Sequence, residues 1–174
     1  MIDLAAIERF LAVLEQAGIV FEMRHHQPPR HARHLAAIWQ ADLLEAARAT
    51  LLQADESIVL AVVPADRKIS APRLRELLGA RALRVLRGDR GVGRTGWEGL
   101  PGPPGALPAI PGLFGARAVV EPLVLESPRL ILALQPGRSL ALAPDVYTRA
   151  VQAQVAPFAG ITRLPNKITP WERL

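Results

Sequence analysis

The four histidines of this sequence fall within ten residues, a spacing that could gather imidazoles around a metal ion. They are His25, His26, His31 and His34. No Asp or Glu lies beside them, and Pro28-Pro29 divides the group. We therefore expect no metal site, and we interpret the segment as a polar loop with one functional histidine.

Two familiar catalytic or binding motifs can be excluded. Gly91, Gly93 and Gly96 match the G-x-G-x-x-G dinucleotide fingerprint, but a Pro/Gly-rich segment follows where a helix must open against the pyrophosphate. No G-x-S-x-G elbow is present, and the serines lie at turns far from the histidines, so a Ser-His-Asp triad is not expected. The absence of cysteine excludes disulfides, thiolate catalysis, zinc fingers and iron–sulfur clusters.

Arg48 is a charged residue in an apolar stretch of sequence, which is unusual for an arginine. It follows Ala46 and Ala47 and opens the apolar run 48–52, which has the composition of a strand. Alternation along a strand would place Arg48, Thr50 and Leu52 on one face. Two interpretations stay open: a functional cation held in a cleft, or an edge-strand arginine whose head reaches water along the surface.

Positive charge is concentrated in one part of the chain. The net charge is +5, yet residues 67–98 hold nine cations against three acids, a local charge of +6. Such an excess attracts polyanions and makes their binding salt-dependent. A nucleic-acid footprint and a plain solvated basic face are equally compatible with it. The cations we single out as candidate nucleic-acid contacts are Arg67, Lys68, Arg73, Arg87, Arg90 and Arg94.

Both helices and strands are predicted to position these residues. One helix is predicted between Asp3 as N-cap and Gly18 at its end, and another between Ser70 as N-cap and Gly79 at its end. Two further helical segments are predicted over 34–46 and 145–154. Strands are predicted at 19–24, 48–53, 57–63, 83–86, 116–121, 129–134 and 139–143. Because they alternate without a strict βαβ order, we predict a mixed α+β fold.

Length and composition indicate one domain. The chain has 174 residues, half of them hydrophobic, which is enough for a sizeable core. Residues 88–115 are too rich in Gly and Pro for a helix or a central strand, and a loop of this length is usually functional. We place the domain at 1–157 and a C-terminal tail at 158–174. We find neither a membrane-spanning run nor a leader, so we expect a cytoplasmic protein.

Three stretches together resemble the YbaK/prolyl-tRNA-synthetase-associated domain family. They are ARATLLQADESIVLAVVPADRKISAPRLRELLGARALRVL, TGWEGLPGPPG and LILALQPGRSLALAPDVY. The likeness runs from about Ile19 to Val151 and is strongest over 60–66. It implies a single domain around a large, curved, mixed β-sheet with flanking helices.

The resemblance also implies site residues. The family's pocket lysine falls on Arg48, which keeps the charge but cannot lose a proton. The family's G-x-x-x-P loop beside the amino-acid pocket corresponds to Gly99, Gly102, Pro103 and Pro104. His26 stands where members carry a histidine before prolines, and Ser139 follows a turn that lacks the family's acid. Thr50 would be a nearby hydroxyl.

The function implied is hydrolysis, in trans, of the ester that joins a wrong amino acid to a tRNA. Arg48 would hold the ester or the terminal phosphate, loop amides would stabilise the oxyanion, and a small pocket would reject larger amino acids. The partners implied are mischarged tRNA and an aminoacyl-tRNA synthetase, without a cofactor. The alternative is a tRNA-binding module with a regulatory role that keeps the fold without turnover.

Overall fold

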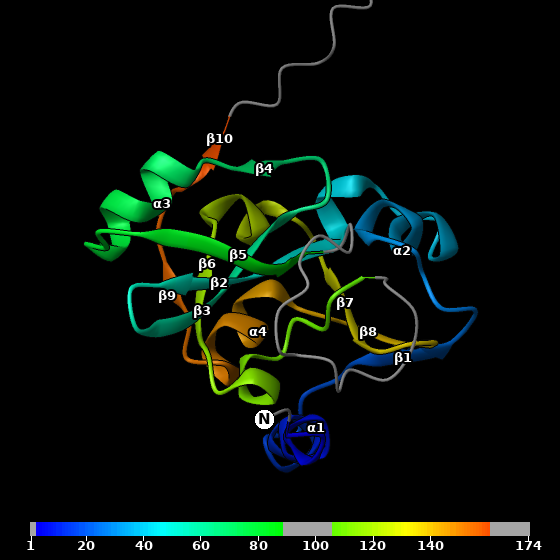
Figure 1. Ribbon diagram of the computed structural model, residues 1–174. Helices are drawn as coiled ribbons and strands as arrows, with labels where there is room; N and C mark the ends of the chain where they lie inside the picture. Colours follow the sequence, from blue (N-terminus) through cyan, green and yellow to red (C-terminus); the bar gives the residue numbers. More distant parts are fainter. Residues whose placement is uncertain (1–2, 89–105, 161–174) are drawn as a thin grey trace, which may run out of the picture.

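A β-hairpin that carries Arg48 lies at the centre of the protein (Figure 1). The structure is a computed structural model, and it describes residues 3–88 and 106–160. β2 (Ala47–Ala54) pairs antiparallel with β3 (Ser57–Pro64), and Asp55 turns the chain between them with a φ of 51°. The strands predicted at 48–53 and 57–63 are therefore confirmed, and they form a hairpin.

The hairpin belongs to a five-stranded sheet with the order β5-β2-β3-β6-β9. β5 (Leu83–Gly88) runs antiparallel to β2, whereas β6 (Arg117–Val120) runs parallel to β3 and β9 (Gln154–Val155) runs parallel to β6. The sheet is therefore mixed. β2 is an inner strand of this sheet over Thr50–Ala54, where β3 and β5 flank it, and the described pairing of Arg48 itself is with Val63 of β3.

A second sheet of three antiparallel strands has the order β1-β8-β7. Its strands are β1 (Glu22–His25), β8 (Arg138–Leu142) and β7 (Leu130–Gln135). It meets the first sheet through a bridge between Ala46 and Ile131. A short pair of strands, β4 (Lys68–Ile69) and β10 (Ala159–Gly160), lies at the end of the described chain.

Helices cover the sheets on several sides (Figure 1). The α-helices are α1 (Ala5–Gln16), α2 (Ala32–Ile38), α3 (Ala71–Leu78) and α4 (Pro144–Ala150), and the short 3₁₀ turns are η1 (Leu43–Glu45), η2 (Pro111–Phe114) and η3 (Pro122–Glu126). α1 and α4 pack on one face of the central sheet, α3 packs on its other face, and α2 packs on β7 and β8. The protein is thus a single α+β domain, as the sequence predicted.

The alternation of β2 assigns its side chains to two cores. Ala47, Ala49 and Leu51 belong to the large core shared with α1, α4 and the three-stranded sheet. Leu52 and Ala54 belong to the smaller core under α3. Arg48 and Thr50 have the parity of Leu52, so their side chains leave the sheet on the α3 face.

The predicted ends of helices are confirmed where a capping side chain or a glycine with positive φ ends the helix. Ser70 accepts a hydrogen bond from the N–H of Arg73 and caps α3, and Gly79 ends that helix with a φ of 61°. The first helix exists, but its N-cap is Leu4 instead of Asp3, and Leu4 is 55 % exposed. The last helix ends at Ala150, short of the predicted residue 154, because the chain then forms β9.

Residues 158–160 pack onto the domain. Phe158 is fully buried in the core under α3. The buried carboxylate of Glu121 accepts hydrogen bonds from the N–H groups of Phe158 and Ala159, each at 2.7 Å. Among the helices of residues 3–88 and 106–160, none has the length and apolar character to cross a membrane.

Candidate functional site

The Arg48 side chain is half-buried and is directed by the strand to the α3 face of the sheet. Its Nη1 donates a hydrogen bond to the carbonyl oxygen of Arg67 at 3.2 Å. Arg67 lies just after β3, where the chain turns into β4. The structure therefore brings together two residues that the sequence singled out for different roles, Arg48 for catalysis and Arg67 for tRNA.

Arg67 lines a cavity of about 420 Å³ between α3, β10 and η3. The other residues of its lining include Arg73, Glu121, Leu123, Pro157 and Gly160. Arg67 is fixed by an ion pair with Asp66 at 2.8 Å, and Nη1 of Arg73 donates to the carbonyl of Ala159 at 3.0 Å. Two guanidinium groups are thus held at one hollow, next to the backbone that Arg48 contacts.

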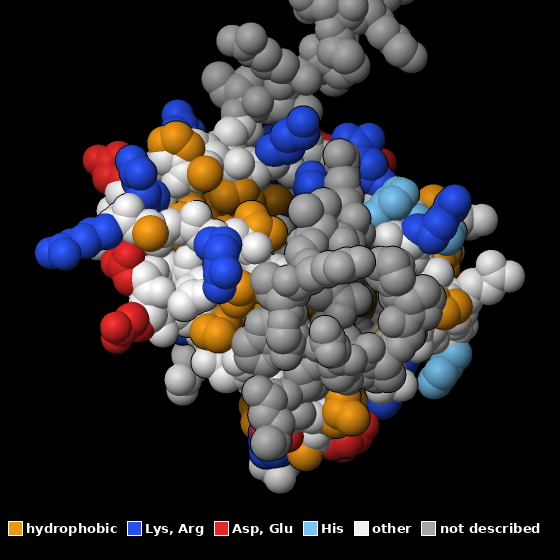
Figure 2. All heavy atoms as spheres, in the orientation of Figure 1, with side chains coloured by type: hydrophobic (Ala, Val, Ile, Leu, Met, Phe, Trp, Pro, Cys, Tyr) orange, Lys and Arg blue, Asp and Glu red, His pale blue; other side chains and the backbone are white. Residues whose placement is uncertain are grey.

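Cationic side chains are also found on the surface near the elements that line this hollow. Figure 2 shows Lys and Arg side chains gathered over the region of α3 and β4, with hydrophobic side chains between them. Lys68, on β4, is exposed. Arg87 lies in β5 and pairs with Leu51, and its side chain is not among the described ones. Arg67, Lys68 and Arg73 are therefore grouped by the fold as well as by the sequence.

The loop expected to border the amino-acid pocket lies outside the described residues. The predicted loop residues Gly99, Gly102, Pro103 and Pro104 are therefore not described. The same holds for Arg90 and Arg94, which were predicted to contact tRNA. The two described flanks of the loop are informative. Gly88 pairs with Thr50 on β2, and the N–H of Ala106 donates to the carbonyl of Pro29 at 3.2 Å. One flank therefore lies beside Thr50 and the other beside the His26 segment.

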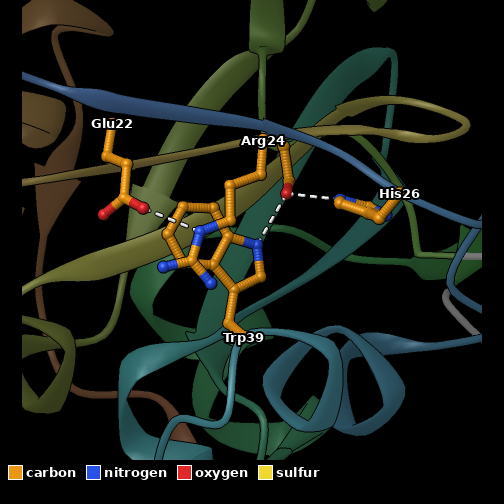
Figure 3. A network of polar contacts seen from close by, with 5 residues as sticks. Glu22, Arg24, His26 and Trp39 are labelled. Atoms are coloured by element: carbon orange, nitrogen blue, oxygen red, sulfur yellow. Dashed lines mark hydrogen bonds and ion pairs between the residues drawn. The ribbon is translucent and has the colours of Figure 1, made fainter.

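His26 and Ser139 form a second group, at the end of the three-stranded sheet (Figure 3). Nε2 of His26 lies 2.5 Å from Oγ of Ser139, and its Nδ1 lies 2.7 Å from the carbonyl oxygen of Gln27. Nε1 of Trp39 donates to the same Ser139 hydroxyl at 2.7 Å. Ser139 is fully buried and Trp39 is 2 % exposed.

Donor and acceptor chemistry gives this network a direction. The Gln27 carbonyl only accepts, so Nδ1 of His26 carries a proton, and indole N–H only donates, so Ser139 Oγ accepts from Trp39. In the neutral imidazole Nε2 is then an acceptor, and the Ser139 hydroxyl donates to it. The arrangement matches that of a hydroxyl beside a base, but the burial of Ser139 keeps it from substrate. It positions His26.

Cations also hold the Trp39 ring. The Arg24 guanidinium lies 4.0 Å from the ring centroid and pairs with Glu22 at 2.7 Å (Figure 3), and the Arg129 guanidinium lies 5.6 Å from it. Such cation–π contacts stabilise the ring where it packs on β7 and β8. Sequence reasoning missed Trp39, because its partner on β8 is 100 residues away and no local pattern marks it.

Gly137 allows the close approach of the two segments around His26. The His26 N–H donates to the Gly137 carbonyl at 2.9 Å, and a Cβ on Gly137 would lie 2.9 Å from the His26 oxygen. His31 and His34 use their Nδ1 atoms to accept from the backbone N–H groups of His34 and Arg30. Within residues 3–88 and 106–160, no group of three or more His, Cys, Asp or Glu side chains could hold a metal ion.

Comparisons with known proteins identify related folds among solved structures. No family model matches the chain, and no curated protein matches its sequence. The solved structure of a hypothetical protein matches with a TM-score of 0.69 and 19 % identity, over 89 % of this chain and 99 % of that one. A candidate trans-editing enzyme for prolyl-tRNA synthetase matches with a TM-score of 0.69 and 17 % identity, over 89 % and 97 %.

A third match concerns a longer protein. The structure of a candidate signal transduction protein from Marinobacter aquaeolei VT8 matches with a TM-score of 0.61 and 20 % identity, over 89 % of this chain and 30 % of that chain. At these identities the matches establish a shared architecture for nearly the whole domain, and they leave the activity to be argued from the site.

Proposed function

We propose that this protein hydrolyses, in trans, the ester bond of a mischarged aminoacyl-tRNA. The observation that carries the proposal is the position of Arg48, half-buried on the central strand, against the backbone of Arg67 at a cationic hollow. The match in fold to a candidate trans-editing enzyme, over nearly the full length of both chains, supports the same class of substrate.

Such a reaction makes modest chemical demands, which the described residues can meet. An aminoacyl ester is already activated, so the protein needs to position water or the ribose hydroxyl beside it and to stabilise the developing oxyanion. In this proposal Arg48 holds the ester oxygen or the terminal phosphate, with guanidinium donors in a fixed plane. Thr50, two residues along the same strand face, orients the water or the amino group.

His26 has a supporting role in this proposal. Both of its ring nitrogens are engaged, Nδ1 by the Gln27 carbonyl and Nε2 by Ser139, so its imidazole is held in one orientation. The Ala106 N–H donates to Pro29, three residues after His26, and thereby ties the end of the Gly/Pro-rich segment to it. His26 and Ser139 would thus shape the wall of the amino-acid pocket.

A second candidate function is a tRNA-binding module without turnover. The specific observation in its favour is that the Arg48 guanidinium already donates to a backbone carbonyl, which is a structural use of that group. The same fold also covers 30 % of a longer candidate signal transduction protein, as expected of a module combined with other domains.

A deacylation assay over a panel of mischarged tRNAs tests the two functions. We expect hydrolysis above the uncatalysed rate for at least one small amino acid, and a loss of about 100-fold in Arg48→Ala, as for removal of one oxyanion donor. Arg48→Lys should keep part of the rate because the charge remains. Arg149→Ala, which removes an exposed arginine on α4, is the matched control and should leave the rate unchanged.

Each outcome separates the alternatives, provided that circular dichroism shows that the variants are folded. Hydrolysis that persists in Arg48→Ala would remove Arg48 from the reaction. Binding of tRNA without hydrolysis of any charged tRNA would support the module. Neither binding nor hydrolysis would contradict both functions.

A further inference from the structure

Two neighbouring hollows at α3 share part of their lining, and we call them together the groove. The first is the cavity of about 420 Å³ described above, and the second, of about 430 Å³, lies against α3 and is lined by Arg73, Glu76, Leu77 and Pro157. Both hollows are lined by Arg73 and Pro157, so these two residues lie between them. Each hollow has the volume of a pocket for a small organic ligand.

The groove presents two guanidinium groups that can still bind an anion. Arg67 and Arg73 each use one nitrogen in the ion pair with Asp66 and the hydrogen bond to Ala159, and a guanidinium has five N–H donors. These contacts fix both groups in advance, which lowers the entropy lost when a ligand binds. α3 also begins beside the cavity, because Gly160 lies against Ser70, and a helix N-terminus favours negative charge.

Two acids belong to the same lining. Glu121 is buried, and its Oε2 already accepts two backbone N–H bonds, from Phe158 and Ala159. Glu76 is exposed and lines the second hollow. The anion site is therefore expected at the Arg67 end of the groove, where Arg67, Arg73 and the nearby Lys68 outnumber Glu121 and Asp66, the ion-pair partner of Arg67.

The remaining walls are apolar. Leu123 and Pro157 line the first hollow, and Leu77 and Pro157 line the second. We propose that this groove binds a nucleotide-like ligand, with a phosphate held by Arg67 and Arg73 and a planar body against Pro157 and Leu123. Such a ligand has two sources: the single-stranded end of an RNA, or a free nucleotide.

The RNA source rests on the proposed function and deepens it. Since Arg48 contacts the Arg67 backbone, a strand in the groove would lead toward Arg48. The groove would then guide the single-stranded acceptor end of a tRNA, and its phosphates would contribute affinity that falls as salt rises. A free nucleotide would bind without any deacylase activity.

Fluorescence anisotropy with the full chain tests this proposal. The probes are a labelled single-stranded RNA pentamer that ends in CCA and carries no amino acid, and labelled adenosine monophosphate. We expect the combined variant Arg67→Gln and Arg73→Gln to weaken binding at least tenfold and to reduce the salt dependence of RNA binding. Arg75→Gln, an exposed arginine on the same helix outside the lining of both hollows, should change the affinity less than twofold.

The outcomes of this experiment identify the source of the ligand or contradict the proposal that the groove binds it. RNA binding far tighter than nucleotide binding assigns an RNA strand, and equal binding assigns a free nucleotide. No binding of either probe, or equal losses in the groove variant and in Arg75→Gln, contradicts the proposal. Because the probes carry no ester, intact deacylation with unaltered probe binding would reject the groove alone, and probe binding without deacylation would reject the proposed function alone.

Discussion

At the scale of single residues, Ser139 shows how a buried hydroxyl can matter through its neighbours. It is fully buried, accepts from the Trp39 indole and donates to His26. Its surroundings join β8 to α2 and to the end of β1, three elements that are distant in sequence. The hydroxyl thus links the segments that orient His26.

Replacing Ser139 with Ala should destabilise the protein by about 1–3 kcal/mol, because the buried Trp39 N–H would lose its acceptor. Urea denaturation, followed by circular dichroism, measures this change. Ser57→Ala, at an exposed position that begins β3, is the control and should stay within about 0.5 kcal/mol of the wild type. Equal stability of the two variants would show that the network contributes nothing to folding.

At the scale of elements, one carboxylate ties the central hairpin to the strand beside it. Asp55 sits in the β2–β3 turn, and its carboxylate accepts from the backbone N–H groups of Ala82 and Arg81, just before β5. The bond from Ala82 is the larger cause and that from Arg81 the next, and together they lower the pKa of Asp55 below its usual value. The turn is thereby held against the start of β5.

This lowered pKa predicts a pH dependence. An acid whose pKa is lower in the folded state stabilises the fold above its unfolded pKa, about 3.9 for Asp, and that stabilisation is lost as the pH falls through the folded pKa. Asp55→Asn should therefore lower the melting temperature at neutral pH, with a difference that shrinks on acidification. Asn also tolerates the positive φ at this position, which isolates the effect of charge.

Thermal melts of both proteins from pH 7 to pH 2 measure this difference. Glu56→Gln changes the neighbouring charge in the same turn and is the control. A difference between Asp55→Asn and wild type that stays constant over the whole range would show that the charge of Asp55 plays no part.

At the scale of the whole molecule, the central sheet has a core on each face. The large core joins α1, α4 and both sheets, and the smaller core joins α3 to β2, β3, β6 and Phe158. Because β2 and β3 contribute to both, the two cores should unfold together. Phe158 belongs to the segment that we placed in a separate tail, yet its side chain is fully buried.

Phe158→Ala should therefore cost about 3–5 kcal/mol, the usual range for a buried Phe, and should shift one cooperative transition. Far-UV and near-UV circular dichroism during urea unfolding should move together to a lower midpoint. Separate transitions for the two signals would contradict the coupling between the cores. Val155→Ala, at a 40 % exposed position on β9, is the control and should cost far less.

Much of the architecture could be predicted from local sequence. The β2–β3 hairpin, the Ser70 cap and the Gly79 end of α3 depend on residues within one turn of each other, and such preferences act in any context. β4, β9 and β10 could not be predicted, because two-residue strands have no periodicity and exist only through their partners.

The sequence alone determined the residue types, the strand alternation that pairs Arg48 with Thr50, and the excess of positive charge after Arg67. Only the tertiary structure decided that Arg48 reaches the Arg67 carbonyl, that Arg67 and Arg73 meet at one hollow, and that Trp39, Ser139 and His26 join in a network. The physical reason is that caps and alternation act over a few neighbouring residues. A cavity or a buried hydrogen-bond network instead depends on which distant segments pack together.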